Sequence, residues 1–174
     1  DAYASLVFEA IPALFDANEG DRPVRVWVVG CATGEEAYSI AILLLEEAAR
    51  REIRPDIQVF ATDLDGKALA RGREGSYPAA IAADVSEERL RRFFVRDNDL
   101  YRIRREVRDV VVFALHSVLR DPPFSQLDLV SCRNLMIYLD REVQQQVCGI
   151  FQYALRPGGF LFLGTSETAD NLPG

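Results

Sequence analysis

A short glycine-containing segment, GCATGEE at residues 30–36, holds the residue types that most directly suggest chemistry. It follows the apolar run VRVWVV and precedes apolar residues at helical spacing, so we expect it to join a buried strand to a helix. Ligands of open α/β sheets bind beside such a turn, because glycine allows close backbone approach and a helix start presents unpaired N–H groups. However, Gly30-x-x-x-Gly34 departs from the GxGxxG dinucleotide fingerprint. Many strand–helix turns contain glycine for steric reasons alone, so both interpretations stay open.

Acidic residues make a ligand site at this turn more specific. Thr33 and Glu36 have the T-x-x-E spacing of a capping box, which gives Glu36 a structural role. Glu35 is left as either a ligand contact or a carboxylate that compensates the helix dipole. Asp63 ends the next predicted strand, where a carboxylate can accept both hydroxyls of a ribose. Its alternative role is a helix N-cap, for which Asp65 competes. Together these residues indicate a nucleoside-containing cofactor.

The charge at the turn favours one class of cofactor. A dinucleotide places its pyrophosphate at the start of the first helix, where Glu35 and Glu36 would repel it. S-adenosylmethionine has no phosphate and carries a positive charge, so it fits these residues better. The late segment LRPGGFLFLG is also similar to the last turn and hairpin of Rossmann-like methyltransferases.

The elements that must position these residues alternate along the chain. We expect one α/β domain over residues 1–174, with a mostly parallel sheet and an antiparallel C-terminal hairpin. A helix-plus-hairpin insertion, a small β-subdomain, interrupts the alternation at about 86–112. The predicted strands are 24–30, 56–63, two adjacent strands within 100–115, 127–132 and 160–165, with a turn at 156–159. The predicted helices are 5–16 (bent or broken at Pro12), from 35, from 66, 86–94 and 141–155.

Composition excludes several function classes. With 20 basic and 27 acidic residues the net charge is −7, so a nucleic acid partner is not expected. The basic stretch at 102–109 alternates with apolar and acidic residues, as a solvated strand face does. No apolar run is long enough to insert into a bilayer, and no secretory signal is visible. Cys31, Cys132 and Cys148 lack CxxC spacing, which indicates a reducing, cytoplasmic location and no metal site.

Four sequence blocks together resemble one family. GCATGEEAYSIA, FATDLD, SCRNLMIYLD and LRPGGFLFLGTSE occur in the order and approximate spacing found in the CheR-type chemoreceptor glutamate methyltransferases. The resemblance covers nearly the whole chain. The segment RDPPFSQLDLVSCRNLMIYLD is most similar to methyltransferase domains of larger hybrid chemotaxis-type proteins.

The resemblance implies a Rossmann-like methyltransferase that uses S-adenosylmethionine, releases S-adenosylhomocysteine, and methylates glutamates on the cytoplasmic helices of chemoreceptors. In that family's pattern Glu35 contacts the methionine end of the cofactor and Asp63 the ribose. Tyr138 and Arg133 are the catalytic candidates, with the Tyr138 hydroxyl orienting the acceptor. The implied cofactor-binding residues are Gly30, Cys31, Ala32, Glu35, Asp63, Ser117, Val118, Arg133 and Asn134.

Structural alternatives exist for the residues after the 127–132 strand. Arg133 can pair with Asp140 or Asp128, Asn134 can cap the next turn, and Tyr138 can belong to an amphipathic core. The chemistry itself requires few side chains. A glutamate carboxylate is already ionised at neutral pH and attacks a methyl sulfonium without a general base, so positioning and exclusion of water matter most. His116 is accordingly expected in the core or pocket wall.

Three departures from the family pattern affect the expected activity. The chain begins with DAYASL, about where a segment ending in FFR stops in the family, and the family's N-terminal helical domain is absent. Ser117 stands where the family usually has an asparagine that contacts the adenosine end of the cofactor. VRDNDLYRI is short where receptor-tethering members have a glycine-containing loop, so binding of a receptor C-terminal peptide is not expected.

These departures predict a chain that folds, binds the cofactor weakly and methylates poorly. One alternative is therefore a non-catalytic module that senses S-adenosylmethionine or S-adenosylhomocysteine, or docks signalling partners. The other is a nicotinamide-dependent oxidoreductase, which the glutamates after the glycine turn disfavour.

Overall fold

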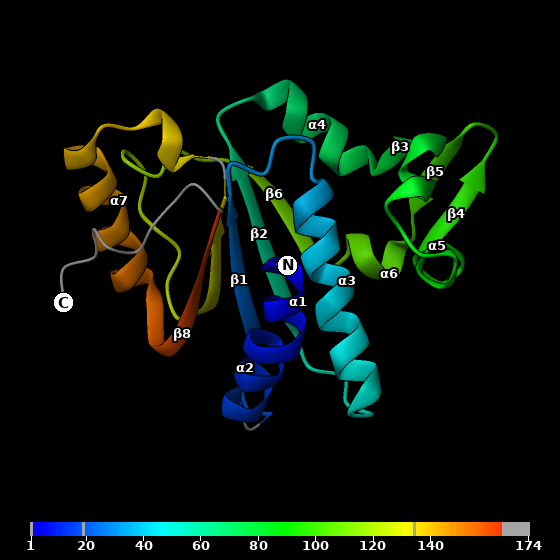
Figure 1. Ribbon diagram of the computed structural model, residues 1–174, viewed down its shortest axis with the longest axis horizontal. Coiled ribbons are helices and arrows are strands. Elements are labelled where there is room, and N and C mark those ends of the chain that lie inside the picture. The colour runs from blue at the N-terminus through cyan, green and yellow to red at the C-terminus, as the bar shows by residue number, and fades with distance from the viewer. Residues whose placement is uncertain (1, 19, 134, 165–174) are drawn as a thin grey trace.

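The computed structural model describes residues 2–18, 20–133 and 135–164. Its centre is a five-stranded sheet in the order β6-β2-β1-β7-β8 (Figure 1). The strands are β1 (Val24–Val29), β2 (Ile57–Asp63), β6 (Val111–Leu115), β7 (Leu127–Cys132) and β8 (Leu155–Leu163). All neighbouring pairs in this sheet are parallel. The carboxyl ends of β1, β2 and β7 therefore meet at one edge, which we call the carboxyl edge.

Helices and short turns connect these strands. The longer helices are α2 (Ile11–Asn18), α3 (Glu35–Arg50), α4 (Gly66–Glu74) and α7 (Arg141–Ala154). The shorter elements are α1 (Ala2–Ser5), the π-helix η1 (Leu6–Ala10), the 3-10 turns η2 (Ala79–Ala83) and η3 (Met136–Tyr138), α5 (Glu87–Phe93) and α6 (Arg105–Arg108). The expected parallel α/β fold is confirmed. In the described part of the chain no helix is long and apolar enough to cross a bilayer.

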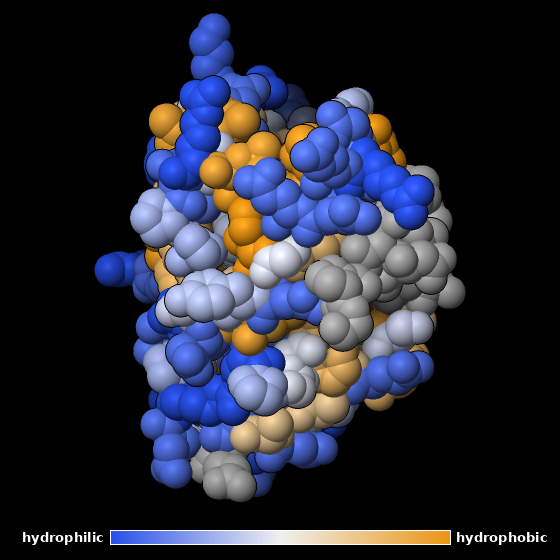
Figure 2. All heavy atoms as spheres, turned by 90° about the vertical axis from the view of Figure 1, so that its left-hand side faces the viewer, coloured by the Kyte–Doolittle hydropathy of each residue, from blue (hydrophilic) through white to orange (hydrophobic). Residues whose placement is uncertain are grey.

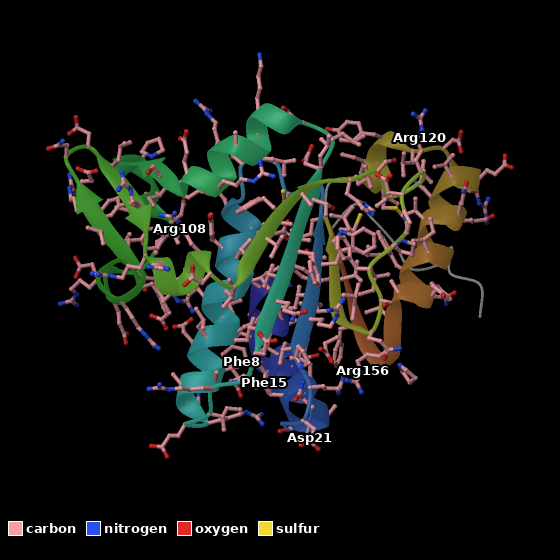
Figure 3. All side chains as sticks on the ribbon, turned by 180° about the vertical axis from the view of Figure 1, so that it is seen from behind. Phe8, Phe15, Asp21, Arg108, Arg120 and Arg156 are labelled. Carbon is pink, nitrogen blue, oxygen red and sulfur yellow. The ribbon has the colours of Figure 1, made fainter. Side chains whose placement is uncertain are left out.

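Alternation along the strands separates two apolar cores. Val26 and Val28 of β1 face the layer of α2 and α3, whereas Trp27 and Val29 face α7. This follows from the two-residue period of a strand buried on both faces. Figure 3, seen from behind, shows α3 beyond the sheet and α7 beside it. The outer side of α7 carries the exposed Arg141, Glu142, Gln145, Gln146 and Gln152, and Figure 2 shows largely hydrophilic colours on that side.

A small antiparallel sheet stands apart from the central one, as expected for an inserted β-subdomain. Its order is β3-β5-β4, formed by β3 (Ser76–Pro78), β5 (Leu100–Ile103) and β4 (Phe94–Asp97). The helix and hairpin fall within 86–112, but β3 extends the small sheet back to Ser76. The basic stretch at 102–109 is only partly a strand, because residues 105–108 form α6. The two strands predicted at 100–115 consequently belong to different sheets.

Two local expectations need correction. The break that was one of the two expected effects of Pro12 does not occur, because α2 continues through it; the preceding turn widens instead, with the Ile11 N–H donating to the Leu6 oxygen five residues back. A π-helical turn of this kind accommodates proline, which has no backbone N–H to donate within the helix. Residues 156–159 lie within β8, whose register with β7 shifts irregularly near Leu129. Any strand that completes an antiparallel C-terminal hairpin lies beyond Gly164, outside the described residues.

Candidate functional site

The turn from β1 to α3 is held in a left-handed conformation. Gly30 has φ 68°, Ala32 φ 49° and Gly34 φ 94°. A Cβ on Gly34 would lie 2.9 Å from the ring of Phe113, so this position requires glycine for space as well as for conformation. The Cys31 N–H donates to Thr62 of β2 and the Gly34 N–H to the Cys31 oxygen, both at 2.9 Å. Helix α3 then begins at the carboxyl edge without a side-chain cap.

The predicted capping box is wrong. Gly34 is the N-cap of α3, so Thr33 lies one residue too early to reach the third helical N–H. The Thr33 hydroxyl instead donates to the Glu35 carboxylate at 2.6 and 2.7 Å. Glu36 faces β7, where its carboxylate accepts a hydrogen bond of 3.0 Å from the Ser131 hydroxyl. The two adjacent glutamates therefore point to different surroundings.

Glu35 borders a cavity of about 550 Å³. Most residues along this cavity are apolar and come from the N-terminal helices, α3 and the small sheet. Tyr38, Tyr77 and Phe94 are among them, and Asp84 and Arg89 add charge. Glu35 thus connects the glycine turn to this cavity.

Asp63 fastens the turn to the end of β2. Its Oδ2 accepts the Ala32 N–H and its Oδ1 accepts the Asp65 N–H, each at 2.9 Å. Asp65, not Asp63, is the N-cap of α4, because its side chain accepts from the Lys67 and Ala68 N–H groups. Each carboxylate oxygen of Asp63 retains a lone pair for a further donor.

Cys31 is buried in the same turn. Burial raises the pKa of the Cys31 thiol to about 12, and the nearby carboxylates, Asp63 first, add to the shift. Its sulfur is held near the Ala32 oxygen at 3.7 Å. A thiol that stays protonated at neutral pH is a poor nucleophile, so Cys31 contributes shape and backbone rather than reactivity.

Residues after β6 reach the same edge. The backbone N–H of His116 donates to the backbone carbonyl oxygen of Asp63 at 3.2 Å. The His116 ring packs edge-on against Trp27, and its Nε2 lies 2.8 Å from the Pro122 oxygen. Since that oxygen can only accept, Nε2 donates this hydrogen bond. Nδ1 is buried and has no hydrogen-bond partner among the described residues.

Ser117 and Val118 begin the loop to β7. The Ser117 N–H donates to Asp121 at 2.7 Å, which closes the loop on itself. Val118 is buried against the core on the α7 side. Figure 3 shows Arg120, in the same loop, at the carboxyl edge.

Arg133 follows β7 and lies in a compact cluster. Its Nη1 is 3.8 Å from the Glu36 carboxylate, and its guanidinium lies 5.0 and 5.1 Å from the ring centres of Tyr3 and Phe162. It does not use the partners that the sequence offered. Asp128 binds Arg22 and Arg156 at the opposite edge, and Asp140 caps α7. The buried Nε of Arg133 has no partner in the described chain. Asn134 lies outside the described residues.

Tyr138 is not a core residue. It lies in η3 and is 79% exposed, and its neighbour Ile137 is 51% exposed. The amphipathic-core alternative for Tyr138 is therefore wrong. Its hydroxyl is accessible to a molecule that approaches the carboxyl edge from outside.

The residues present fit S-adenosylmethionine. Glu35, Glu36 and Asp63 bring three carboxylates to the glycine turn, which suits a ligand with an ammonium and a sulfonium. Leaving buried polar atoms unpaired is costly. Nε of Arg133 can donate to the carboxylate of this cofactor. Nδ1 of His116 can accept from its amino groups or from its hydroxyl groups. The described residues contain no cluster of three or more potential metal ligands.

Comparison with known proteins decides the family. The family model described as "CheR methyltransferase, SAM binding domain" matches residues 1–174. This chain belongs to the CheR methyltransferase family. Its cofactor is S-adenosylmethionine, and the nicotinamide alternative is excluded by this membership.

Relatives of this CheR domain extend across most of its length. An uncharacterized 104.1 kDa protein of Rhodobacter capsulatus is 41% identical over 96% of the chain and 18% of its own length. "Chemotaxis protein methyltransferase 1" of Pseudomonas aeruginosa is 34% identical over 94% of the chain and 61% of its own length. The chain therefore spans less than two thirds of these relatives. "The structure of PKMT2 from Rickettsia typhi in complex with AdoHcy" shares the fold, with TM-score 0.51, 16% identity and coverage of 91% of this chain and 25% of that one.

Sequence reasoning missed three side chains of the Arg133 cluster in this CheR domain. Glu36 was assigned to a cap, and Tyr3 belongs to a helix with no recognisable motif. Ser131 offered a usable signal, because it is a polar residue at the end of the fully buried strand β7. The structure brings Glu36 and Tyr3 to Arg133, and Ser131 to Glu36.

Proposed function

We propose that this chain is the catalytic domain of an S-adenosylmethionine-dependent protein-glutamate O-methyltransferase that acts on chemoreceptors. The observation that carries the proposal is the meeting of Glu36, Asp63 and Arg133 at the carboxyl ends of β1, β2 and β7 in a CheR-family chain. Parallel α/β sheets bind ligands at this edge.

Each element contributes part of the cofactor site. The backbone of Gly30, Cys31 and Ala32 forms its floor, and Asp63 accepts the ribose hydroxyls with its remaining lone pairs. Ser117 and Val118 line the adenine end, beside the Asp63–His116 contact. The proposed cofactor site is completed by Arg133 and Asn134, which follow β7.

The two glutamates share the methionine end. Glu36 lies nearer to β7, where it meets Ser131 and Arg133, so we assign the larger share of ammonium binding to Glu36. Glu35, held by Thr33, forms the outer wall. We assign the Arg133 Nε–H as a donor to the carboxylate of the same amino acid, because it has no hydrogen-bond partner among the described residues.

The reaction needs orientation more than proton transfer. S-adenosylmethionine supplies an electrophilic methyl group, which moves to a glutamate carboxylate oxygen and leaves a methyl ester and S-adenosylhomocysteine. No residue of this chain has to remove a proton, because the acceptor is already ionised. We expect the exposed Tyr138 to hydrogen-bond the incoming carboxylate through its hydroxyl, and the bound acceptor would exclude water.

The acceptor is a glutamate on a cytoplasmic chemoreceptor helix. We place the domain in the cytoplasm, since Cys31, Cys132 and Cys148 are buried and none of them forms a disulfide within the described part of the chain. The β4–β5 hairpin turns within two residues, with Asn98 at φ 53°. So tight a turn offers little surface, which supports the absence of peptide tethering.

Methyl transfer to a receptor fragment tests the function. The chain, within its full-length protein, is incubated with labelled S-adenosylmethionine and a receptor cytoplasmic fragment, beside a fragment whose acceptor glutamates are glutamine. We expect base-labile label on the glutamate fragment alone. Equal labelling of both fragments would contradict the proposal.

A second candidate is a module that binds the cofactor without transferring its methyl group. The 79% exposure of Tyr138 favours it, because no described side chain encloses the proposed methyl site on that side. Tight binding of S-adenosylhomocysteine with no label on any receptor fragment would support this candidate instead.

A further inference from the structure

Tyr3 reaches the candidate site from the opposite end of the chain. It lies on α1, yet its ring centre is 5.0 Å from the Arg133 guanidinium and 5.7 Å from the Phe162 ring of β8. Phe162 itself lies 5.1 Å from the same guanidinium. Three segments distant in sequence therefore meet at one cation.

The Tyr3 hydroxyl lies among the polar members of this cluster. Burial raises the pKa of Tyr3, and the Glu36 carboxylate raises it further, whereas the Arg133 guanidinium opposes the shift. Tyr3 thus contacts Arg133 with its ring while its hydroxyl interacts with both Arg133 and Glu36.

We propose that Tyr3 is a positioning residue, which together with Phe162 holds the Arg133 guanidinium in the orientation that cofactor binding requires. The five N–H donors of a guanidinium lie in its plane, whereas its faces attract aromatic rings. Rings packed on Arg133 therefore leave the N–H groups in the guanidinium plane available: Nη1 lies 3.8 Å from the Glu36 carboxylate, and the buried Nε has no hydrogen-bond partner among the described residues.

Holding Arg133 in advance affects binding. A free arginine side chain samples many rotamers, and that conformational entropy is lost when a ligand immobilises it. Tyr3 and Phe162 remove part of that freedom before the ligand arrives. This inference rests on the proposed function, because its readout is affinity for the cofactor product.

Tyr3→Phe and Tyr3→Leu separate the ring from the hydroxyl. The first keeps the ring on Arg133 and loses only the polar contacts, whereas the second loses both. Phe8→Leu is the matched control, because Phe8 is on the adjoining helical turn, is 78% exposed and lies below the carboxyl edge (Figure 3).

The experiment measures S-adenosylhomocysteine affinity by calorimetry for the intact protein and these variants. We expect Tyr3→Leu to weaken binding about tenfold, Tyr3→Phe to lie between Tyr3→Leu and the parent, and Phe8→Leu to bind as the parent does. In turnover, Tyr3→Leu should raise the KM for S-adenosylmethionine more than it lowers kcat.

A second measurement does not depend on a ligand. Denaturant unfolding is measured for Tyr3→Leu, Arg133→Met and the double variant. The losses in the free energy of unfolding should not be additive, because both substitutions remove the same contact between Tyr3 and Arg133. Parent-like affinity in folded Tyr3→Leu, or equal losses in Tyr3→Leu and Phe8→Leu, would overturn the role of Tyr3 and leave the proposed function standing. No binding by the parent protein would overturn both.

Discussion

Asp63 Oδ2 accepts a 2.9 Å hydrogen bond from the backbone N–H of Ala32. This bond ties the end of β2 to the left-handed turn that follows β1. The residue proposed to hold the ribose is therefore also a residue that shapes the floor under the cofactor, so binding and local structure depend on the same carboxylate.

The paired glutamates should contribute unequally to affinity. We predict that Glu36→Gln weakens binding of S-adenosylhomocysteine by at least about tenfold, since a charge-assisted contact is lost beside Arg133. Glu35→Gln is the matched control and should cost less, because Thr33 already occupies its carboxylate. Calorimetric titration of both variants measures this, and a larger loss for Glu35→Gln would reverse our assignment.

Gly34 should tolerate no side chain. Gly34→Ala would place a Cβ 2.9 Å from Phe113 at φ 94°. We therefore expect this change to lower the free energy of unfolding by at least about 2 kcal/mol. Gly149→Ala is the control, because Gly149 lies within α7 with open space around its Cβ direction. That change should stabilise the protein by about 0.5–1 kcal/mol. Urea denaturation compares the two, and similar effects in both would contradict the geometry of the turn.

Alkaline pH should destabilise the fold through Cys31 and Tyr38. Burial raises the pKa of Cys31 from 9.0 to about 12 and that of Tyr38 from 10.0 to about 12. Between about pH 9 and 12 the unfolded chain has released protons that the folded chain retains, so the free energy of unfolding falls as pH rises. Below pH 9 this contribution is fully present.

Unfolding measured across that pH range checks the sign. Cys31→Ala and Tyr38→Phe should each make the alkaline decline shallower, because neither replacement titrates. An unchanged slope in both variants would show that these groups ionise equally in the folded and unfolded chain. Alkylation of Cys31 in the folded protein should also remain slow at neutral pH.

Much of the scaffold was predictable from local pattern. The apolar run before Gly30 and the helical spacing after Glu35 indicated β1 and α3, and the parallel sheet followed from the alternation of elements. Asp65, which the sequence offered beside Asp63 as an N-cap, is the N-cap of α4. These features depend on residues close together in the sequence.

The details that failed depend on backbone geometry or distant contacts. The left-handed Gly34 shifted the start of α3 and removed the capping box, which freed Glu36 to face β7. Tyr3 meets Arg133 and Phe162 only after three segments have folded together. No local pattern encodes such a meeting.

Calorimetric titration with S-adenosylhomocysteine of the parent protein, Asp63→Ala and Asp65→Ala tests the cofactor site most directly. Asp65→Ala removes the α4 cap and should cost about 1 kcal/mol of stability while leaving affinity unchanged. Asp63→Ala should weaken binding at least about tenfold, because it removes the ribose acceptor and the bond to Ala32. Equal affinity of folded Asp63→Ala and the parent, or no binding by a folded parent, would contradict a cofactor site at this edge of the sheet.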